Sequence, residues 1–92
     1  MAEPADDIED VRAANASFYA AFEAGDAEAM ASIWEHSDRA SCTHPGAPTI
    51  HGWPDVDAAW RLILGAAGVP QFIITEERIE VVGDVGWVVA VE

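Results

Sequence analysis

The first quarter of the chain carries apolar residues at helical spacing. A period of about 3.6 places four of them on one face: Ile8, Val11, Phe18 and Phe22. This pattern predicts an amphipathic helix over residues 6–24. Asp6 and Glu9 fit a capping box at its start, with Asp in place of the usual Ser or Thr. Gly25 then favours the left-handed conformation that commonly ends a helix.

Two shorter helices are expected further along. Asp26 should cap a helix over about residues 27–35, because a short polar side chain accepts hydrogen bonds from free N–H groups in the first turn. Residues 54–65 begin with Pro54, which suits the first turn of a helix. Their apolar positions repeat at i, i+3, i+4, i+7 and i+8: Val56, Ala59, Trp60, Ile63 and Leu64.

Extended segments lie between these helices and at the end of the sequence. Strands are expected at four places: residues 39–44, Ile50–His51, residues 71–82 and residues 86–91. The last two form a hairpin around Gly83 and Asp84. The apolar positions of residues 71–82 change phase, which predicts a β-bulge in residues 75–78. Helices first and antiparallel strands last indicate an α+β fold, in which a curled sheet wraps around helices as a cone.

Composition and charge narrow the classes of function. The 92 residues carry a net charge of −13, and all four cations are arginines. This charge repels phosphate and no basic stripe offsets it, so nucleic acid is not an expected partner. Hydrophobic residues make up 51% of the chain, which excludes a disordered protein. The length sets a ceiling of one domain.

The sequence also indicates the cellular compartment of the protein. The single cysteine, Cys42, cannot form an intrachain disulfide. The acidic N-terminus lacks the positive and apolar regions of a signal peptide. No apolar run approaches the roughly 18–20 residues of a membrane span. We therefore expect a cytoplasmic protein with no membrane partner.

Four motifs at the element junctions resemble those of a known family. They are residues 18–26 (FYAAFEAGD), Trp34, residues 42–46 (CTHPG) and residues 48–53 (PTIHGW). In these motifs the chain resembles the SnoaL-like and ketosteroid-isomerase-like proteins of the nuclear transport factor 2 superfamily. The resemblance covers essentially the whole chain and implies one SnoaL-like domain over residues 1–92 with a cone fold. It says little about activity, because this fold hosts enzymes, binding proteins and assembly modules.

The resemblance also implies that the domain is C-terminally incomplete. Family members usually continue past a strand such as residues 86–92 with two more long antiparallel strands. Residues 86–91 are apolar on both faces. We expect this strand to be paired with another chain or left as an exposed edge, and a homodimer is the expected assembly.

His44 is the candidate catalytic residue. In ketosteroid isomerases an Asp-Pro dipeptide at the end of the first strand supplies the general base, and His44-Pro45 stands at the matching place here. The resemblance thus implies a general acid/base, and imidazole titrates near neutrality. The family's first-helix tyrosine, which holds the developing oxyanion, matches Phe18, with Tyr19 one residue on. This departure disfavours steroid isomerisation, and a structural histidine stays open as the alternative.

The aromatic residues are the candidate ligand contacts. Those predicted to line a pocket for a small apolar molecule are Phe18, Tyr19, Phe22, Trp34, Trp60 and Phe72. A simpler interpretation is that they form the hydrophobic core. Both can hold, since core and pocket wall are the same surface in a cone.

Two other groups of residues could carry chemistry. Cys42 and His44 share a strand face at i, i+2, but nothing in the sequence supplies the third group that a Cys–His nucleophile pair needs. A metal site could draw on four polar residues: His36, Asp38, His44 and His51. Their spacing matches no compact ligand motif. We therefore expect no metal and no cofactor.

Three functions follow, in order of preference. The first is a SnoaL-like pocket protein that binds a small apolar ligand, with or without catalysis. The second is an isomerase, dehydratase or cyclase that uses His44 as general acid/base on an apolar carbonyl compound. The third is a non-catalytic dimerisation or assembly module. The acidic surface disfavours an anionic substrate.

Overall fold

The computed structural model describes residues 4–66 and 70–92. The longest helix, α1 (Pro4–Ala24), begins two residues earlier than the sequence predicted, so Asp6 and Asp7 lie in its first turn and Asp6 is not its N-cap. The predicted capping box is therefore wrong. Pro4 explains the earlier start, because its fixed φ suits the first helical turn and it has no N–H to satisfy.

A tight turn connects α1 to α2 (Ala27–Ile33). Gly25 adopts φ of 63°, as expected for a helix C-terminus. The Asp26 side chain accepts a hydrogen bond from the Ala29 N–H, with 3.0 Å between the atoms, which confirms the predicted N-cap. Trp34 then takes an extended conformation, with φ −83° and ψ 151°, and leads the chain out of the helix.

The first two strands are short. β1 (Ser41–Cys42) and β2 (Ile50–His51) pair antiparallel, with Ser41 opposite His51 and Cys42 opposite Ile50. The predicted strand over residues 39–44 is thus longer than the one observed. The Ala40 N–H donates to the Ser37 carbonyl in a turn, so the ladder cannot extend toward the N-terminus. α3 (Trp53–Leu64) follows β2 directly.

The last two strands form a hairpin. β3 (Thr75–Val82) pairs antiparallel with β4 (Val85–Val91) around a turn in which Gly83 adopts φ of 58°. The register shifts between Thr75 and Arg78, which confirms the predicted bulge. Glu76 within this bulge has φ of 54°, the only positive φ of a non-glycine residue in the described part of the chain. Residues 70–74 belong to no strand, so β3 begins later than predicted.

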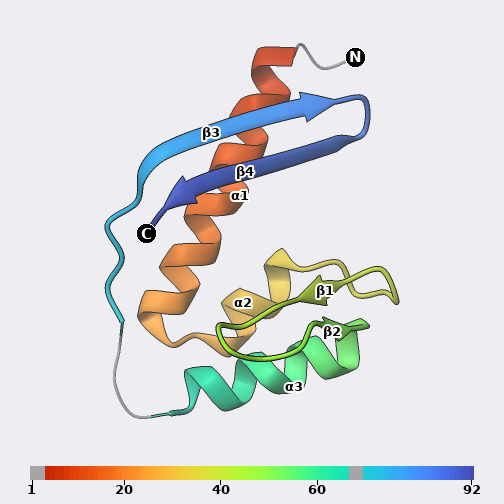
Figure 1. Cartoon of the computed structure of the whole chain (residues 1–92), viewed down its shortest axis with the longest axis vertical. Coiled ribbons are helices and arrows are strands. Elements are labelled where there is room, and N and C mark those ends of the chain that lie inside the picture. Colours follow the sequence, from red (N-terminus) through yellow and green to blue (C-terminus); the bar gives the residue numbers. More distant parts are fainter. Residues whose placement is uncertain (1–3, 67–69) are drawn as a thin grey trace.

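The elements form an α+β arrangement built on α1. The β3–β4 hairpin lies across α1, whereas α2, the β1–β2 pair and α3 gather at the C-terminal end of that helix (Figure 1). The strands form two separate two-stranded sheets in the described residues. The buried core lies between α1, α2 and α3 and contains five residues: Ala21, Met30, Ala40, Val56 and Trp60.

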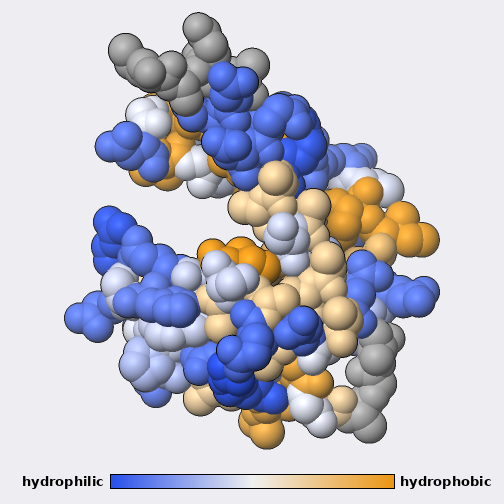
Figure 2. Space-filling view, turned by 180° about the vertical axis from the view of Figure 1, so that it is seen from behind, coloured by the Kyte–Doolittle hydropathy of each residue, from blue (hydrophilic) through white to orange (hydrophobic). Residues whose placement is uncertain are grey.

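The surface is hollowed beside this core. Seen from behind, a recess separates the N-terminal half of α1 from the part of the molecule formed by α2 and the β1–β2 loop (Figure 2). Hydrophilic side chains cover much of the outer surface on this side, and more apolar ones line the recess. No helix in the described part of the chain is both long and apolar enough to cross a membrane.

Candidate functional site

The residues predicted as ligand contacts meet around Trp60 of α3. Trp60 is only 3% exposed, and the rings of Phe18 and Phe22 from α1 approach it edge-on, with centroid distances of 5.4 and 5.1 Å. Phe18 and Phe22 are four residues apart, so one face of α1 presents both. Trp34, which follows α2, lies 6.4 Å from Trp60 at an interplanar angle of 47°. All three helices therefore position aromatic rings in one place.

Two further aromatic residues extend this group. The Phe72 ring lies 4.9 Å from Phe22 and 5.1 Å from Tyr19, in edge contacts. Residues far apart in sequence are thus brought together. We call this group the aromatic cluster: Phe18, Tyr19, Phe22, Trp34, Trp60 and Phe72.

The Tyr19 hydroxyl group is hydrogen-bonded to Glu92, the last residue of the chain. Its hydroxyl donates a hydrogen bond to Glu92 Oε2, with 2.6 Å between the oxygens. Burial of the phenol raises the pKa of Tyr19 to about 12, and the hydrogen bond to the Glu92 carboxylate adds to the shift. Tyr19 is therefore neutral at physiological pH and joins α1 to the end of β4.

His44 follows β1 and contacts the aromatic cluster. Its ring lies 4.9 Å from Trp60 in a T-shaped arrangement, and its Nε2 is 3.6 Å from the Cys42 Sγ. The half-buried imidazole thus lies against the wall predicted to bind ligand. Within the described residues, Cys42 supplies the only hydrogen-bond contact of the His44 ring.

The Cys42 thiol is not poised for nucleophilic attack. Burial raises the pKa of Cys42, which favours the thiol over the reactive thiolate. A nucleophile paired with an activating base would show the opposite shift. The contact between Cys42 and His44 therefore gives no support for a nucleophile pair.

His36, another candidate metal ligand, is engaged elsewhere. The His36 ring stacks on Trp53, with centroids 4.3 Å apart and planes 9° apart, and its Nε2 lies 2.7 Å from the Ala31 carbonyl oxygen. His36 therefore packs against the start of α3. Among the described residues, no group of three or more His, Cys, Asp or Glu side chains is arranged to hold a metal ion.

A groove between α1, the end of α2 and β4 borders the aromatic cluster. Its volume is about 440 Å³, within the range typical of small-molecule sites. We call it the sheet groove, and its lining residues are Val11, Ala14, Asn15, Phe18, Ile33, Trp34, Glu35, Gly86, Trp87 and Val88. Phe18 and Trp34 belong to both the groove and the cluster, so a molecule in the groove would contact aromatic rings.

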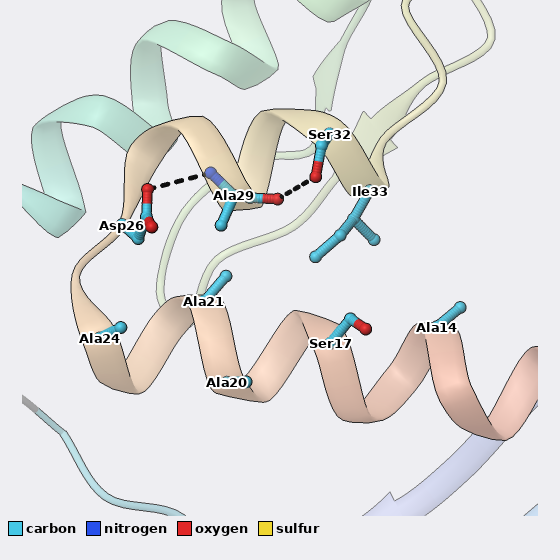
Figure 3. Close-up of a pocket in the computed structure, with 9 residues that line it drawn as sticks. All are labelled: Ala14, Ser17, Ala20, Ala21, Ala24, Asp26, Ala29, Ser32 and Ile33. Atoms are coloured by element: carbon cyan, nitrogen blue, oxygen red, sulfur yellow. Dashed lines mark hydrogen bonds between the residues drawn. The ribbon is translucent and has the colours of Figure 1, made fainter.

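A second groove runs between α1 and α2 (Figure 3). Its volume is about 650 Å³, and its walls carry small side chains that face one another across the gap. We call it the helix groove, and its lining residues are Ala14, Ser17, Ala20, Ala21, Ala24, Asp26, Ala29, Ser32 and Ile33. Sequence reasoning missed it, because the small residues that line it on α1 carry no chemical signal.

Two polar atoms of the aromatic cluster lack partners. The indole nitrogens of Trp34 and Trp60 are buried and, among the described residues, have no hydrogen-bond acceptor. Buried N–H groups are nearly always paired in folded proteins, since desolvation without a partner is costly. These two donors are therefore the polar groups that the aromatic cluster offers to an incoming acceptor.

Most of the chain matches one known protein family. Residues 11–92 match the SnoaL-like domain. The chain belongs to the SnoaL-like domain family. The match includes α2, α3, all four strands and most of α1 of this SnoaL-like domain, together with every residue of the aromatic cluster and His44.

Solved structures show the same fold. A protein of the NTF2-like family from Streptomyces avermitilis, described as a candidate dehydratase, is 34% identical over 96% of this SnoaL-like domain, with a TM-score of 0.88. A candidate calcium/calmodulin-dependent protein kinase type II association domain from Thiobacillus denitrificans is 38% identical over 75% of it, with a TM-score of 0.61. The chain spans 66% and 52% of the lengths of these two proteins. No curated protein matches the chain significantly.

Proposed function

We propose that this SnoaL-like domain binds a small apolar molecule in the sheet groove. The observation that carries the proposal is the continuity between a groove of about 440 Å³ and the aromatic cluster, through Phe18 and Trp34. Aromatic side chains offer large apolar surfaces at little conformational cost. The helix groove is larger, but its alanines and serines offer a ligand no aromatic surface.

The charge around the groove disfavours an anionic ligand. Glu35 lines the sheet groove, and hydrogen bonds from Arg39 and then Ser37 lower the pKa of Glu35 to about 2. The carboxylate is therefore ionised at physiological pH, and no lysine or arginine is among the lining residues. With a net charge of −13 on the chain, an anion would be repelled on approach.

The unpartnered indoles favour a ligand that carries an acceptor oxygen. The N–H groups of Trp34 and Trp60 lack acceptors, and a carbonyl entering among the rings would supply one. Both nitrogens are closed to water, so a small shift of the rings must accompany entry. The proposed ligand class is thus a neutral, apolar carbonyl compound.

Three matched aromatic probes test this proposal. Acetophenone, ethylbenzene and benzoate differ at one substituent, and NMR of the four indole N–H signals reports binding at each tryptophan. We expect acetophenone to bind most tightly, ethylbenzene more weakly and benzoate least. Ala14→Trp should fill the groove and abolish binding, whereas Ala13→Trp, on the exposed neighbouring position, should not.

A further variant distinguishes the two grooves. Ser17 lines the helix groove only, so Ser17→Trp should leave acetophenone binding unchanged. Saturable binding that survives Ala14→Trp, or no saturable shift for any neutral probe, would contradict the proposal.

A second candidate function is proton transfer by His44 on such a ligand. Its support is the position of the imidazole 4.9 Å from Trp60, together with the likeness to a candidate dehydratase. Dehydration of a β-hydroxy carbonyl compound begins when a base removes the proton next to the carbonyl, and the His44 imidazole is the proposed base. The resulting His44 imidazolium then gives that proton to the β-hydroxyl group, the C–O bond breaks, water leaves and a carbon–carbon double bond forms.

Deuterium exchange of the acetophenone methyl group in heavy water measures the first half of this step. We expect the domain to accelerate exchange and His44→Gln to abolish the acceleration. His36→Gln is the matched control, because His36 packs on Trp53 away from the aromatic cluster. Exchange that is equal in His44→Gln and the unmodified protein would remove His44 from consideration.

A further inference from the structure

The segment that follows α2 brings a hydrogen-bond donor and an acceptor to the sheet groove. Trp34 and Glu35 are consecutive residues, and both line that groove. The Trp34 indole nitrogen is buried and has no acceptor among the described residues, whereas the Glu35 side chain is half-exposed. An indole N–H can only donate and an ionised carboxylate can only accept. A ligand that used both residues would therefore carry one acceptor and one donor.

The Glu35 carboxylate is held in place by its own loop. Ser37 Oγ and Arg39 Nε both donate to Glu35 Oε2, the second across 2.9 Å, and Arg39 Nη2 donates to Oε1. The Ser37 hydroxyl also accepts from the Arg39 backbone N–H, with 3.1 Å between the atoms. The Ser37 carbonyl accepts from the Trp53 N–H at 3.1 Å, which joins this loop to the start of α3. The carboxylate is thus preorganised before a ligand arrives.

One acceptor position of this carboxylate is left over. An ionised carboxylate has about four lone-pair sites. The hydrogen bonds from Ser37 and Arg39 fill two sites on Oε2 and one on Oε1, so within the described residues one site of Oε1 is unused. The Arg39 guanidinium already balances the negative charge through two of these bonds. The unused site therefore suits a neutral donor, and a hydroxyl group is such a donor.

We propose that Glu35 is a specificity-determining residue of the sheet groove and selects a carbonyl compound that also carries a hydroxyl group. This inference rests on the proposed ligand site and narrows its substrate class. The carbonyl oxygen accepts from the Trp34 indole, and the hydroxyl group donates to Glu35 Oε1. Arg39 is a positioning residue, because it holds the Glu35 carboxylate but does not line the groove. No step of this assignment depends on His44.

Three matched ketones test the assignment in NMR titrations of the tryptophan indole signals. Propiophenone has no hydroxyl group, β-hydroxypropiophenone carries one, and β-methoxypropiophenone has an oxygen at the same place that cannot donate. In the unmodified protein we expect the hydroxy ketone to bind at least about tenfold more tightly than the methoxy ketone, as for a hydrogen bond to a charged acceptor. The titrations are repeated with His44→Gln, which removes the proposed base, so that dehydration does not consume the probe.

Three variants locate the preference in the Glu35 carboxylate. Glu35→Leu should erase the preference for the hydroxy over the methoxy ketone, while propiophenone still binds. The ion pair that this variant removes is exposed and contributes little to stability, so the variant should fold. Arg39→Gln leaves the carboxylate less constrained and should reduce the preference in part, again without loss of propiophenone binding. Asp38→Asn is the matched control, because Asp38 is a neighbouring carboxylate that does not line the groove.

The results separate the role of Glu35 from the proposed ligand site. Equal binding of the hydroxy and methoxy ketones by the unmodified protein would overturn the role of Glu35, although binding of propiophenone would still support the ligand site. A preference that survives Glu35→Leu, or one that is lost equally in Asp38→Asn, would also overturn it. Failure of propiophenone to bind the unmodified protein would contradict the ligand site itself, and this inference with it.

Discussion

The Tyr19 hydroxyl and the Glu92 carboxylate meet across 2.6 Å, although 73 residues separate them in sequence. The bond joins the C-terminal third of α1 to the residue that follows β4. Tyr19 also packs edge-on against Phe18 and Phe72, so one side chain connects the aromatic cluster to the hairpin. Tyr19 is the only tyrosine of the chain, which makes the bond directly measurable.

Spectrophotometric titration of Tyr19 should show a midpoint near pH 12 in the folded protein, against an ordinary value of 10.0. The folded state holds the phenol proton more tightly than the unfolded state. The resulting stability is therefore complete below pH 10 and is lost as pH rises toward 12. Glu92→Gln should lower the pKa only in part, because burial is the larger cause. A midpoint at the unfolded value would contradict the observed contact.

Cys42 should react slowly with iodoacetamide in the folded protein. Burial raises its pKa and limits access, so we expect the native rate to be at least about tenfold below the rate in denaturant. Mass spectrometry follows the reaction cleanly, because Cys42 is the only cysteine. His44→Gln should leave the native rate slow. A fast native reaction that depends on His44 would instead indicate an activated thiolate.

Gly86→Ala should destabilise the packing of the hairpin on α1. The added methyl group would lie 2.7 Å from Val11 Cγ2, closer than carbon atoms approach in folded proteins. Overpacking of this kind costs about 1–3 kcal/mol in the free energy of unfolding. Val11→Ala in the same chain should recover part of the loss. Urea denaturation of the two single variants and the double variant measures the coupling, and strict additivity would contradict the contact.

Val56→Ala and Leu62→Ala compare buried and exposed positions of α3. Val56 is fully buried, whereas Leu62 is 78% exposed. We expect Val56→Ala to lower the free energy of unfolding by about 1–3 kcal/mol through lost contacts and a residual cavity. Leu62→Ala should change it by less than about 0.5 kcal/mol. Equal effects in thermal or urea unfolding would show that the core lies elsewhere.

Local patterns in the sequence predicted most of the elements. Gly25, the Asp26 cap and the bulge after Thr75 were found because each depends on one residue or on a short phase change. Strand lengths were less accurate. Residues 39–44 yield only Ser41–Cys42, because a backbone hydrogen bond between Ala40 and Ser37 turns the chain before the ladder can form.

The contacts among the candidate aromatic residues could be anticipated from the sequence, whereas the shape of the grooves beside them could not. Aromatic residue types drew attention to the aromatic cluster, and helical spacing indicated which of them share a face. The two grooves depend on which surfaces remain uncovered after packing, and small residues such as Ala14 and Ser17 carry no chemical signal. The contact between Tyr19 and Glu92 is equally long-range, and no local pattern indicates it.

The unequal distribution of the core has a consequence for hydrogen exchange. Every fully buried hydrophobic residue that the structure describes lies between Ala21 and Trp60, and the hairpin strands hold none of them. The hairpin is joined to the rest mainly along α1. We therefore expect backbone amides of Ile79 and Val88 to exchange through a partial opening, faster than those of Met30 and Val56. The molecule then behaves as two cooperative units of unequal stability that share one helix.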